Sequence, residues 1–418
     1  MEKNEKIENS VFEKFYKKPV EERIEIIKNY FGEDIANNLN KPLSIHEADK
    51  IIENVIGIAS LPIGLLTNLK INNKHYVVPM ALEEPSVVAA ANKACKLSLP
   101  EGFFAETEGN EMIGLVQLKV NNIEKAKQKL EEIKNEVNDY GKELCKNLEK
   151  YGGGWKFFYT EELKTERGNF LIIKFVIDTA DAMGANIINT VAEGLGAFLE
   201  EKINGKALLR IISNYAIRRK VKVNVVFKIN KNERELFLDA FEIAKHDLFR
   251  TVTNNKGFMN GADAVAIAFG QDFRALEAAL HSYSIYNKKP LVDFKEHENG
   301  IEAIADLPIA VGITGGAINV LHHAKAALKM SKVTSAKELA MIIACAGIAN
   351  NFAATYALAT EGIQKGHMKL HSRIIALYLG ANEKEIEKII ELIEQKKIKP
   401  KTEEIKEALE KIRKGNVI

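Results

Sequence analysis

The sequence has few cysteines and almost no net charge, and both shortages exclude classes of protein. Its 418 residues include 3 cysteines, 1 tryptophan and 9 prolines, and 59 Lys and Arg stand against 57 Asp and Glu. Cys95, Cys145 and Cys345 lie too far apart for a disulfide framework or a CxxC metal site, which predicts a reducing, cytoplasmic setting. A net charge of +2 leaves no broad basic surface for nucleic acid.

Long hydrophobic runs are also missing. The chain begins with the polar residues MEKNEK and no apolar segment follows, which argues against a secretory signal. Each apolar run is interrupted by a charge or a turn residue before the roughly 18 residues that a membrane span needs, so we expect no membrane partner. The length of 418 residues predicts two or three domains, because single cores stop growing near roughly 250–300 residues.

A change in the pattern of expected elements near residue 110 marks an internal unit. Before it, a capping box at Ser44 and Glu47 opens a helix, Asn72-Asn73 connects the strands of a hairpin, and an Ala-rich helix covers 87–97. The order then becomes strand, helix, two strands, helix and strand, as in a ferredoxin-like βαββαβ unit. The expected ranges are 112–120, 123–149, 155–160, 170–178, 183–202 and 221–229.

The remainder is expected to be mainly helical, with helices at 233–248, 271–286 and 320–364, a Gly/Asn-rich segment at 254–261 and a glycine-rich turn at 307–316. The whole pattern predicts an α+β fold. A large helix-rich domain is interrupted by the small ferredoxin-like domain and followed by a helical C-terminal segment. The expected boundaries are 1–109 and 218–365 for the large domain, 110–217 for the small one and 366–418 for the C-terminal segment.

Two short motifs place charged groups where they can act on a substrate. Glu83-Glu84-Pro85-Ser86 puts two carboxylates before a helix N-terminus, where the helix dipole acts on nearby charge. The alternative is that a carboxylate merely caps the helix. Lys256 lies among asparagines and glycines, from which it can polarise a carbonyl or stabilise an oxyanion. The alternative there is a surface turn.

Two further motifs hold an aspartate and a pair of histidines. Asp272 follows Gly270-Gln271 at a loop-to-helix transition, where a helix N-cap explains it without catalysis. His367 and His371 have the i, i+4 spacing of half a zinc site, but Met368 stands where the zincin motif requires glutamate. A proton-donating histidine is therefore favoured, and we expect no metal.

Candidate coenzyme-binding residues lack the usual dinucleotide fingerprint. Gly194-Leu195-Gly196 lies within an expected helix, with Leu199 at the position of the third glycine. Residues 181–186 (DAMGAN) are more suggestive, because small residues at a strand-to-helix junction let a pyrophosphate approach free N–H groups. Tight packing of the strand on the helix explains them equally well.

Seven motifs arrive in the order in which they occur in 3-hydroxy-3-methylglutaryl-CoA (HMG-CoA) reductase, and the chain resembles that family from residue 53 to residue 373. The Glu-Glu-Pro-Ser form and the C-terminal segment with His367 resemble the soluble class II branch, whereas GQD is spelled as in class I. The motifs are 53–57 (ENVIG), 84–86 (EPS), 181–186 (DAMGAN), 255–261 (NKGFMNG), 270–272 (GQD), 315–316 (GG) and 366–368 (GHM).

The resemblance implies a role for each matching residue. The catalytic residues would be a proton donor, a lysine that stabilises the oxyanion at the reduced thioester carbon, an aspartate hydrogen-bonded to that lysine and a histidine that protonates the CoA thiolate; they match Glu84, Lys256, Asp272 and His367. The residues that would hold the HMG group match Ser86, Arg250, Asn260 and Asn351. The coenzyme segment matches Asp181, Met183, Gly184 and Asn186.

The resemblance further implies a reaction and an assembly. The expected activity is the four-electron reduction of HMG-CoA to mevalonate and CoA with two NAD(P)H, in isoprenoid biosynthesis. The large domain would bind substrate, the small domain coenzyme, and the C-terminal segment would be a flap. Sites at the interface of a homodimer are expected as well. The alternatives are mevalonate degradation with NAD, a non-catalytic CoA-ester-binding relative, and a metal-dependent hydrolase using His367 and His371.

Charge near the small domain's first helix suggests which coenzyme is preferred. Class II enzymes that favour NADH carry an acidic residue there, poised for the adenosine 2′-hydroxyl. Gapless matching back from Gly152 puts Cys145 at that position, with Lys142 and Lys146 nearby. This pattern predicts NADPH over NADH, because lysines favour the additional phosphate.

Overall fold

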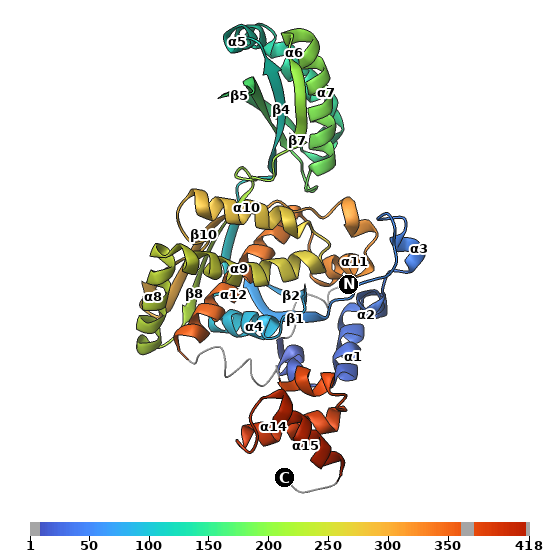
Figure 1. Ribbon diagram of the computed structural model, residues 1–418, viewed down its shortest axis with the longest axis vertical. Coiled ribbons are helices and arrows are strands. Elements are labelled where there is room, and N and C mark those ends of the chain that lie inside the picture. Colours follow the sequence, from blue (N-terminus) through green and yellow to red (C-terminus); the bar gives the residue numbers. More distant parts are fainter. Residues whose placement is uncertain (1–8, 361–371, 415–418) are drawn as a thin grey trace.

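The computed structural model describes residues 9–360 and 372–414, and their elements form three parts along one axis (Figure 1). A central body contains most of the helices and two sheets. A small α/β unit stands at one end of it, and a helical unit that includes α14 (Glu383–Glu394) and α15 (Thr402–Arg413) lies at the other. The mixed α+β fold predicted from the sequence is confirmed.

The central body is built on an antiparallel four-stranded sheet of order β3-β8-β10-β9 and a separate hairpin, β1-β2. The strands are β1 (Ile63–Ile71), β2 (Lys74–Ala81), β3 (Phe104–Thr107), β8 (Lys220–Lys228), β9 (Asp293–His297) and β10 (Gly300–Pro308). The helices are α4 (Val87–Leu97), α8 (Lys231–His246), α9 (Leu248–Ala268), α10 (Phe273–Tyr286), α11 (His322–Met330) and α12 (Ala336–Ala359). Strands β9 and most of β10 were not expected from the sequence.

Short helices cover the N-terminal side of the central body. They are η1 (Asn9–Phe12), η2 (Phe15–Lys17), α1 (Val20–Phe31), α2 (Glu33–Asn40) and α3 (Ile45–Ala48), and η4 (Gly316–Asn319) precedes α11. Ser44 and Glu47 form the predicted capping box at α3. Asn72 and Asn73 have φ of 48° and 66°, the left-handed pair that a tight hairpin turn requires, so the predicted β1-β2 hairpin is confirmed.

Helix α12 is the core helix of the central body. Its 24 residues carry no charge after Glu338, and it packs against α9 and α4. By length and composition it could span a bilayer, so the expectation that every apolar run is interrupted earlier was wrong: Gly347, Asn350 and Asn351 do not break the helix. The most apolar window is 89% buried within the protein, as in the core helix of a soluble domain.

The Gly/Asn-rich segment 254–261 lies inside α9, so the alternative of a surface turn is excluded. Its glycines allow close packing on α12: a Cβ at Gly261 would lie 2.3 Å from the Ala346 carbonyl oxygen. The buried Asn255 side chain donates to the Ser284 hydroxyl (2.7 Å) and accepts from the Leu291 N–H (3.1 Å). Asparagine and glycine therefore serve contacts between helices here, although in a single sequence they resemble a turn.

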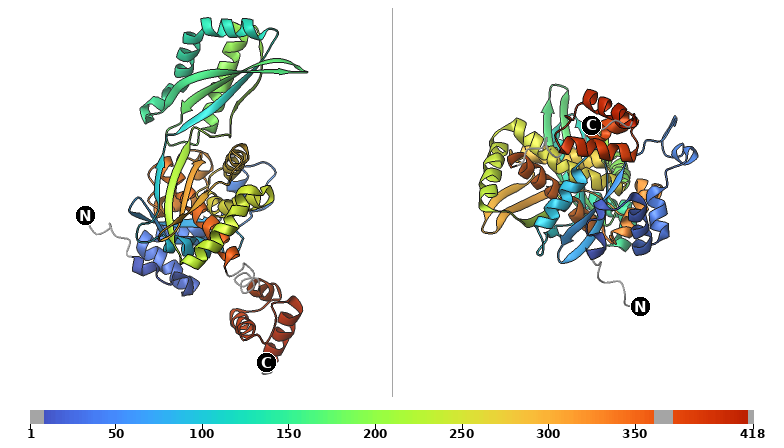
Figure 2. Two further views of the ribbon diagram at one scale, coloured as in Figure 1. Left: turned by 90° about the vertical axis from the view of Figure 1, so that its left-hand side faces the viewer. Right: turned by 90° about the horizontal axis from the view of Figure 1, so that it is seen from below.

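The small unit is a four-stranded antiparallel sheet of order β5-β6-β4-β7, with helices α5, α6 and α7 on one face (Figure 2). This is the ferredoxin-like arrangement. Its own hydrophobic core is centred on residues such as Val116, Phe175 and Leu195. Its elements are β4 (Glu111–Val120), α5 (Ile123–Glu132), α6 (Lys134–Cys145), η3 (Lys146–Tyr151), β5 (Gly154–Thr165), β6 (Gly168–Asp178), α7 (Ala185–Ile203) and β7 (Lys206–Ile212).

Two expectations for this unit are corrected by the structure. The last strand is β7, whereas 221–229 forms most of β8 in the central sheet. Periodicity identified a strand but could not say which sheet it joins, and β8 alternates buried and exposed residues more regularly than β7. The single helix expected at 123–149 is divided at Ile133 and ends in the 3₁₀ helix η3.

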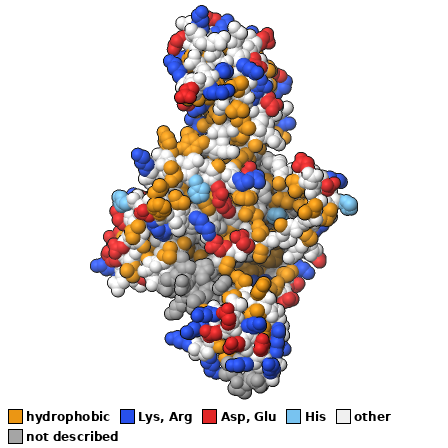
Figure 3. Space-filling model, in the orientation of Figure 1, with side chains coloured by type: hydrophobic (Ala, Val, Ile, Leu, Met, Phe, Trp, Pro, Cys, Tyr) orange, Lys and Arg blue, Asp and Glu red, His pale blue; other side chains and the backbone are white. Residues whose placement is uncertain are grey.

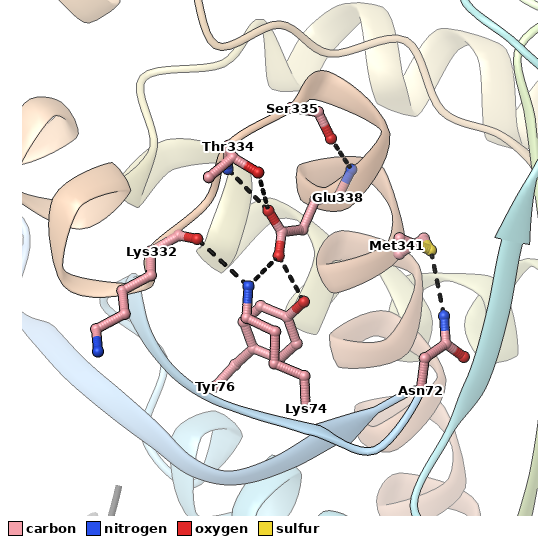
Figure 4. A network of polar contacts seen from close by, with 8 residues as sticks. All are labelled: Asn72, Lys74, Tyr76, Lys332, Thr334, Ser335, Glu338 and Met341. Atoms are coloured by element: carbon pink, nitrogen blue, oxygen red, sulfur yellow. Dashed lines mark hydrogen bonds and ion pairs between the residues drawn. The ribbon is translucent and has the colours of Figure 1, made fainter. Parts of the chain in front are cut away.

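A buried carboxylate joins the β1-β2 hairpin to the start of α12 (Figure 4). Glu338 accepts hydrogen bonds from Lys74 (2.5 Å) and from the Tyr76 hydroxyl (2.6 Å). Its second oxygen accepts from the Thr334 N–H at 2.8 Å. Burial alone would raise the pKa of Glu338, but the hydrogen bonds from Lys74, Tyr76 and Thr334 lower it below 4.5.

Replacing Glu338 by glutamine is expected to destabilise the protein by about 1–2 kcal/mol at neutral pH, because charge-assisted hydrogen bonds are lost. Since the folded pKa is depressed, this stabilisation is complete above the unfolded value near 4.5 and is lost as pH falls below it. Thermal melting at pH 7 and pH 4 should show a gap between wild type and E338Q that narrows at the lower pH. Glu108→Gln, which breaks the exposed pair with Lys222, is the control and should barely change Tm.

Candidate active site

Glu84 and Lys256, which are far apart in the chain, contact each other at the surface of the central body. Glu84 lies in the loop before α4 and Lys256 in the middle of α9, and the Lys256 Nζ is 2.6 Å from the Glu84 Oε2. Their side chains are 36% and 59% exposed, so the pair is open to solvent in the single chain. The arrangement provides a cation and a potential proton donor within reach of one substrate atom.

Asp272 has a different set of contacts from the one predicted. Its Oδ1 accepts from the Ala275 N–H at 3.2 Å, which caps α10, and pairs with Arg274 at 3.3 Å. Within the described part of the chain it has no ion pair with Lys256. The neighbouring Gln271 accepts from the Gly312 N–H at 2.9 Å, which ties this loop to the segment after β10.

The predicted substrate-binding residues fall into two groups. The side chains of Ser86 and Arg250 are free to bind a substrate. Ser86, with φ of 75°, is the N-cap residue of α4, but its side chain does not cap the helix. Arg250 has no ion pair among the described residues. Burial lowers the pKa of the Arg250 guanidinium. Asn260 lies one turn after Lys256 on α9 and is half-buried. Asn351 is 1% exposed and its amide donates to the Asn254 carbonyl at 2.6 Å, so it is engaged between α9 and α12.

A large cavity opens beside Glu84 and Ser86. It has a volume of about 2060 Å³ and lies between the N-terminal helices and the central body. Basic side chains of Arg23, Lys41 and Lys96 contribute to its walls, among many apolar ones. In the space-filling view, hydrophobic side chains gather around a hollow between the central body and the C-terminal unit (Figure 3). Such a cavity can hold a long ligand with an apolar part and anionic groups.

The segment between β6 and α7 fits a dinucleotide. Gly184 has φ of 105° at the N-cap of α7, and a Cβ there would lie 2.5 Å from the Thr179 Cγ2. No side chain caps this helix and its first turn holds no acid, so its free N–H groups and dipole favour an anion. Met183 is half-buried and Asn186 is exposed. The Asp181 carboxylate accepts from the Ala336 N–H at 2.8 Å, at the start of α12.

Of the residues expected to select the coenzyme, Cys145 lies in the core and the two lysines lie on the surface. Cys145 is 1% exposed and its thiol donates to the Gly141 carbonyl, so it faces the core and cannot meet a ribose. Cys145 is the last residue of α6 and shares its buried face with Val137 and Gly141. Lys142 and Lys146 are exposed and form ion pairs with Asp139 and Glu143 on their own helix.

Two groups near the site were not singled out in the sequence. Arg219 is buried at the junction of the small unit with the central body, where its guanidinium donates to the segment 179–184. The sequence Arg218-Arg219-Lys220 resembles a solvated basic run, so only its position before a strand hinted at burial. Asp263 on α9 contacts Glu277 on α10, and burial together with this neighbour raises the pKa of the Asp263 carboxyl.

The described residues hold no cluster of metal ligands. Across 9–360 and 372–414, no three His, Cys, Asp or Glu side chains are grouped so as to hold a metal ion. His367 and His371 lie outside the described residues. The predicted histidine role and the alternative zinc site therefore have no structural description here.

Comparison with known proteins agrees with the fold. The family profile of hydroxymethylglutaryl-coenzyme A reductase matches residues 19–372. The chain is 41% identical over 410 residues to 3-hydroxy-3-methylglutaryl-coenzyme A reductase of Archaeoglobus fulgidus, covering 96% of this chain and 94% of the relative. The corresponding reductase structure from Streptococcus pneumoniae superposes with a TM-score of 0.80 at 33% identity, over 96% of this chain and 99% of that one.

A second Streptococcus pneumoniae structure, the class II reductase bound to NADPH in open conformations, matches with a TM-score of 0.79 at 33% identity, covering 84% of this chain and 100% of that one. The comparisons thus identify the chain as an NAD(P)H-dependent oxidoreductase. The chain belongs to the hydroxymethylglutaryl-coenzyme A reductase family.

Proposed function

We propose that this protein reduces HMG-CoA to mevalonate and CoA with two NAD(P)H, supplying isoprenoid biosynthesis. The observation that carries the proposal is the contact of 2.6 Å between Lys256 and Glu84, of which Glu84 also lines the large cavity. The pair is assembled from segments 172 residues apart, which favours catalysis over a non-catalytic CoA-ester-binding role. The names of the relatives support the reductive direction over mevalonate oxidation.

The residues divide the chemistry between charge stabilisation and proton supply. Bound NAD(P)H supplies the two hydrides. The Lys256 ammonium neutralises the negative charge that develops on the thioester oxygen, and Asp272 is proposed to hydrogen-bond that lysine after leaving its pairing with Arg274. His367 protonates the departing CoA thiolate, and Glu84 donates the proton that completes reduction of the aldehyde.

Binding of the substrate follows from charge and cavity shape. The half-buried Arg250 guanidinium, without an ion pair in the described residues, suits the free carboxylate of the HMG group. Ser86, Asn260 and Asn351 are proposed to hold its remaining oxygens. For Asn351 this requires its amide to share or leave the hydrogen bond to Asn254. The CoA part would occupy the large cavity, whose basic side chains suit phosphates.

The test of the reaction is its stoichiometry. Purified protein with HMG-CoA should oxidise two NADPH for each CoA thiol released, followed by absorbance at 340 nm and a thiol reagent. A ratio of one, or release of thiol without coenzyme oxidation, would reject the reductase in favour of an aldehyde-forming or hydrolytic enzyme. Full activity in the presence of a chelator is expected, because no metal takes part.

NADPH is proposed as the preferred coenzyme. The NADPH-bound neighbour supports it, as do the exposed Lys142 and Lys146 and the absence of acid in the first turn of α7. Cys145 no longer contributes to the argument. We expect kcat/KM for NADPH to exceed that for NADH by about tenfold, one favourable charge contact. Equal values, or a preference for NADH, would contradict the proposal.

A homodimer with sites at its interface is proposed as the working form. Large apolar side chains are exposed on two segments: Ile56 is 100% exposed in the loop before β1, and Phe249 is 85% exposed at the start of α9. The openness of the Lys256 site supports a partner that excludes water. Sedimentation should give a dimer or larger assembly, and Ile56→Glu should weaken it and lower activity together. An active wild-type monomer would refute the dimer.

The remaining proposals concern organisation and setting. Domain boundaries are proposed at 1–109 and 218–365 for substrate, 110–217 for coenzyme and 366–418 for the flap. Separate hydrophobic cores support this division, including one in the C-terminal unit around Ala376, Ile389 and Leu409. A cytoplasmic, reducing setting is proposed because all three cysteines are buried free thiols.

A further inference from the structure

The buried side chain of Arg219 makes an unusual set of hydrogen bonds at the junction of the two larger parts. Arg219 is 2% exposed. Its Nη1 donates to the Thr179 hydroxyl at 3.1 Å, the Ala182 carbonyl at 3.0 Å and the Met183 carbonyl at 3.2 Å. Its Nη2 donates to the Val311 carbonyl. One planar guanidinium therefore holds both sides of the junction.

The charge of Arg219 is retained although the group is buried. Burial lowers its pKa to about 10, opposed by the nearby carboxylates of Asp178 and Asp181, so the guanidinium is still cationic at neutral pH. Neither aspartate is its direct hydrogen-bond partner: Asp178 pairs with Lys156 and Asp181 accepts from Ala336. The donors are instead directed at carbonyl oxygens, which fixes backbone conformation.

The backbone held in this way is the segment proposed to bind coenzyme. Residues 179–184 run from the end of β6 to the uncapped N-terminus of α7. They also lie along 311–314: Ile313 N–H donates to the Asp181 carbonyl at 2.9 Å, and Ala182 forms a parallel bridge with Thr314. The contact is so close that a Cβ at Gly312 would lie 2.4 Å from the Met183 nitrogen.

The same backbone leads to the catalytic loop. Gly312 N–H donates to the Gln271 side chain at 2.9 Å, and Gln271 precedes Asp272. Arg219 thus fixes the coenzyme segment against the segment after β10, which also contacts Gln271, the neighbour of the proposed catalytic Asp272. The distance between the two substrates in the site depends on this junction, and hydride transfer is sensitive to such positioning.

We propose that Arg219 is a positioning residue that keeps the segment 179–184 in the conformation that binds the nicotinamide coenzyme. The inference rests on the proposed function for the identity of the ligand. Without the Arg219 side chain, the backbone that leads to the N-terminus of α7 should no longer be held in one conformation. Coenzyme binding should weaken as a result. The cavity proposed for CoA has neither Arg219 nor any residue of 179–184 in its walls, so the binding of CoA esters should be unaffected.

The test uses direct binding to the full chain, without turnover. In a fluorescence titration, the Kd of the Arg219→Met variant for NADPH should be about tenfold or more above that of wild type. This corresponds to the loss of one charge-assisted hydrogen bond, here from Arg219 to the backbone of the coenzyme segment. Arg219→Lys, which keeps the charge but not the fork, should recover part of the affinity. The Kd for CoA should stay within about twofold, and in turnover KM for NADPH should rise more than kcat falls.

Arg218→Met is a matched control. It removes the adjacent arginine, whose partners are the half-buried Glu111 at 2.7 Å and the ring of Phe157. NADPH affinity should be unchanged in this variant. An NADPH Kd for folded R219M equal to that of R218M would overturn the proposal, as would equal losses of CoA and NADPH binding. If R219M does not fold, R219K decides by the same criteria. Wild-type protein that binds neither NADPH nor NADH would overturn the proposed function itself.

Discussion

Replacing Lys256 by alanine is expected to lower kcat for HMG-CoA reduction about a thousandfold, or roughly 4 kcal/mol of transition-state stabilisation. The reason is that the ammonium opposes charge that exists on the oxygen only during hydride transfer. KM for HMG-CoA should change much less, because the neutral thioester gains little from the cation. Steady-state assays of K256A with saturating NADPH measure both constants.

The control for this variant is Lys245→Ala. Lys245 lies on the neighbouring helix α8 and pairs with Glu242 at 3.5 Å, far from any proposed role. Its rate should remain close to that of wild type. Both variants should melt like wild type, since Lys256 is 59% exposed and its surface ion pair adds little stability. A K256A rate within tenfold of wild type would remove Lys256 from the mechanism.

Replacing Glu84 by glutamine is expected to reduce kcat by at least about a hundredfold, the usual contribution of a general acid. Glutamine keeps the size of the side chain but cannot give up a proton, and it weakens the pairing that holds the Lys256 ammonium. The loss should appear with added mevaldehyde as well as with HMG-CoA, because the second proton is needed in both reactions.

Glu83→Gln is the matched control, as it changes the adjacent carboxylate of the same motif. Glu83 is exposed and should retain most of the activity. The double variant of Glu84 and Lys256 should be no slower than the slower single variant by more than a few fold, because the pair acts as a unit. Fully additive losses would show that the contact of 2.6 Å has no functional meaning.

Local patterns in the sequence were sufficient for much of the fold. The range 87–97 expected for the Ala-rich helix coincides with α4, and Asn72-Asn73 forms the expected turn. Such features depend on neighbours in the chain. The helix at 254–261 was missed because its asparagines hydrogen-bond to α12 and α10 and its glycines pack against α12. These contacts come from distant parts of the chain and leave no local pattern in the sequence. The confusion of β7 with β8 has the same origin, since pairing is decided far away in sequence.

The candidate site was predicted to a similar extent. Motif order gave Glu84 and Lys256, which the structure brings together, but not Arg219, whose role depends on carbonyls of two other segments. Cys145 shows the opposite failure: a gapless match gave its position along the chain, but not that it lies on the buried face of α6. Residue type and spacing can suggest chemistry, whereas the direction of a side chain depends on tertiary packing.

The pairing of β3 with β8 brings together the two points at which the chain leaves and re-enters the central sheet. Thr107 and Val221 are opposite one another in the central sheet, so the chain leaves on one strand and returns on its neighbour. The ends of the intervening 110–217 are therefore one strand spacing apart, roughly 5 Å. A tight turn would close that gap without rerouting the chain. The unit proposed to recognise the coenzyme is thus an insertion at one point of the central sheet, and it can be exchanged or remodelled without rerouting the chain of its host.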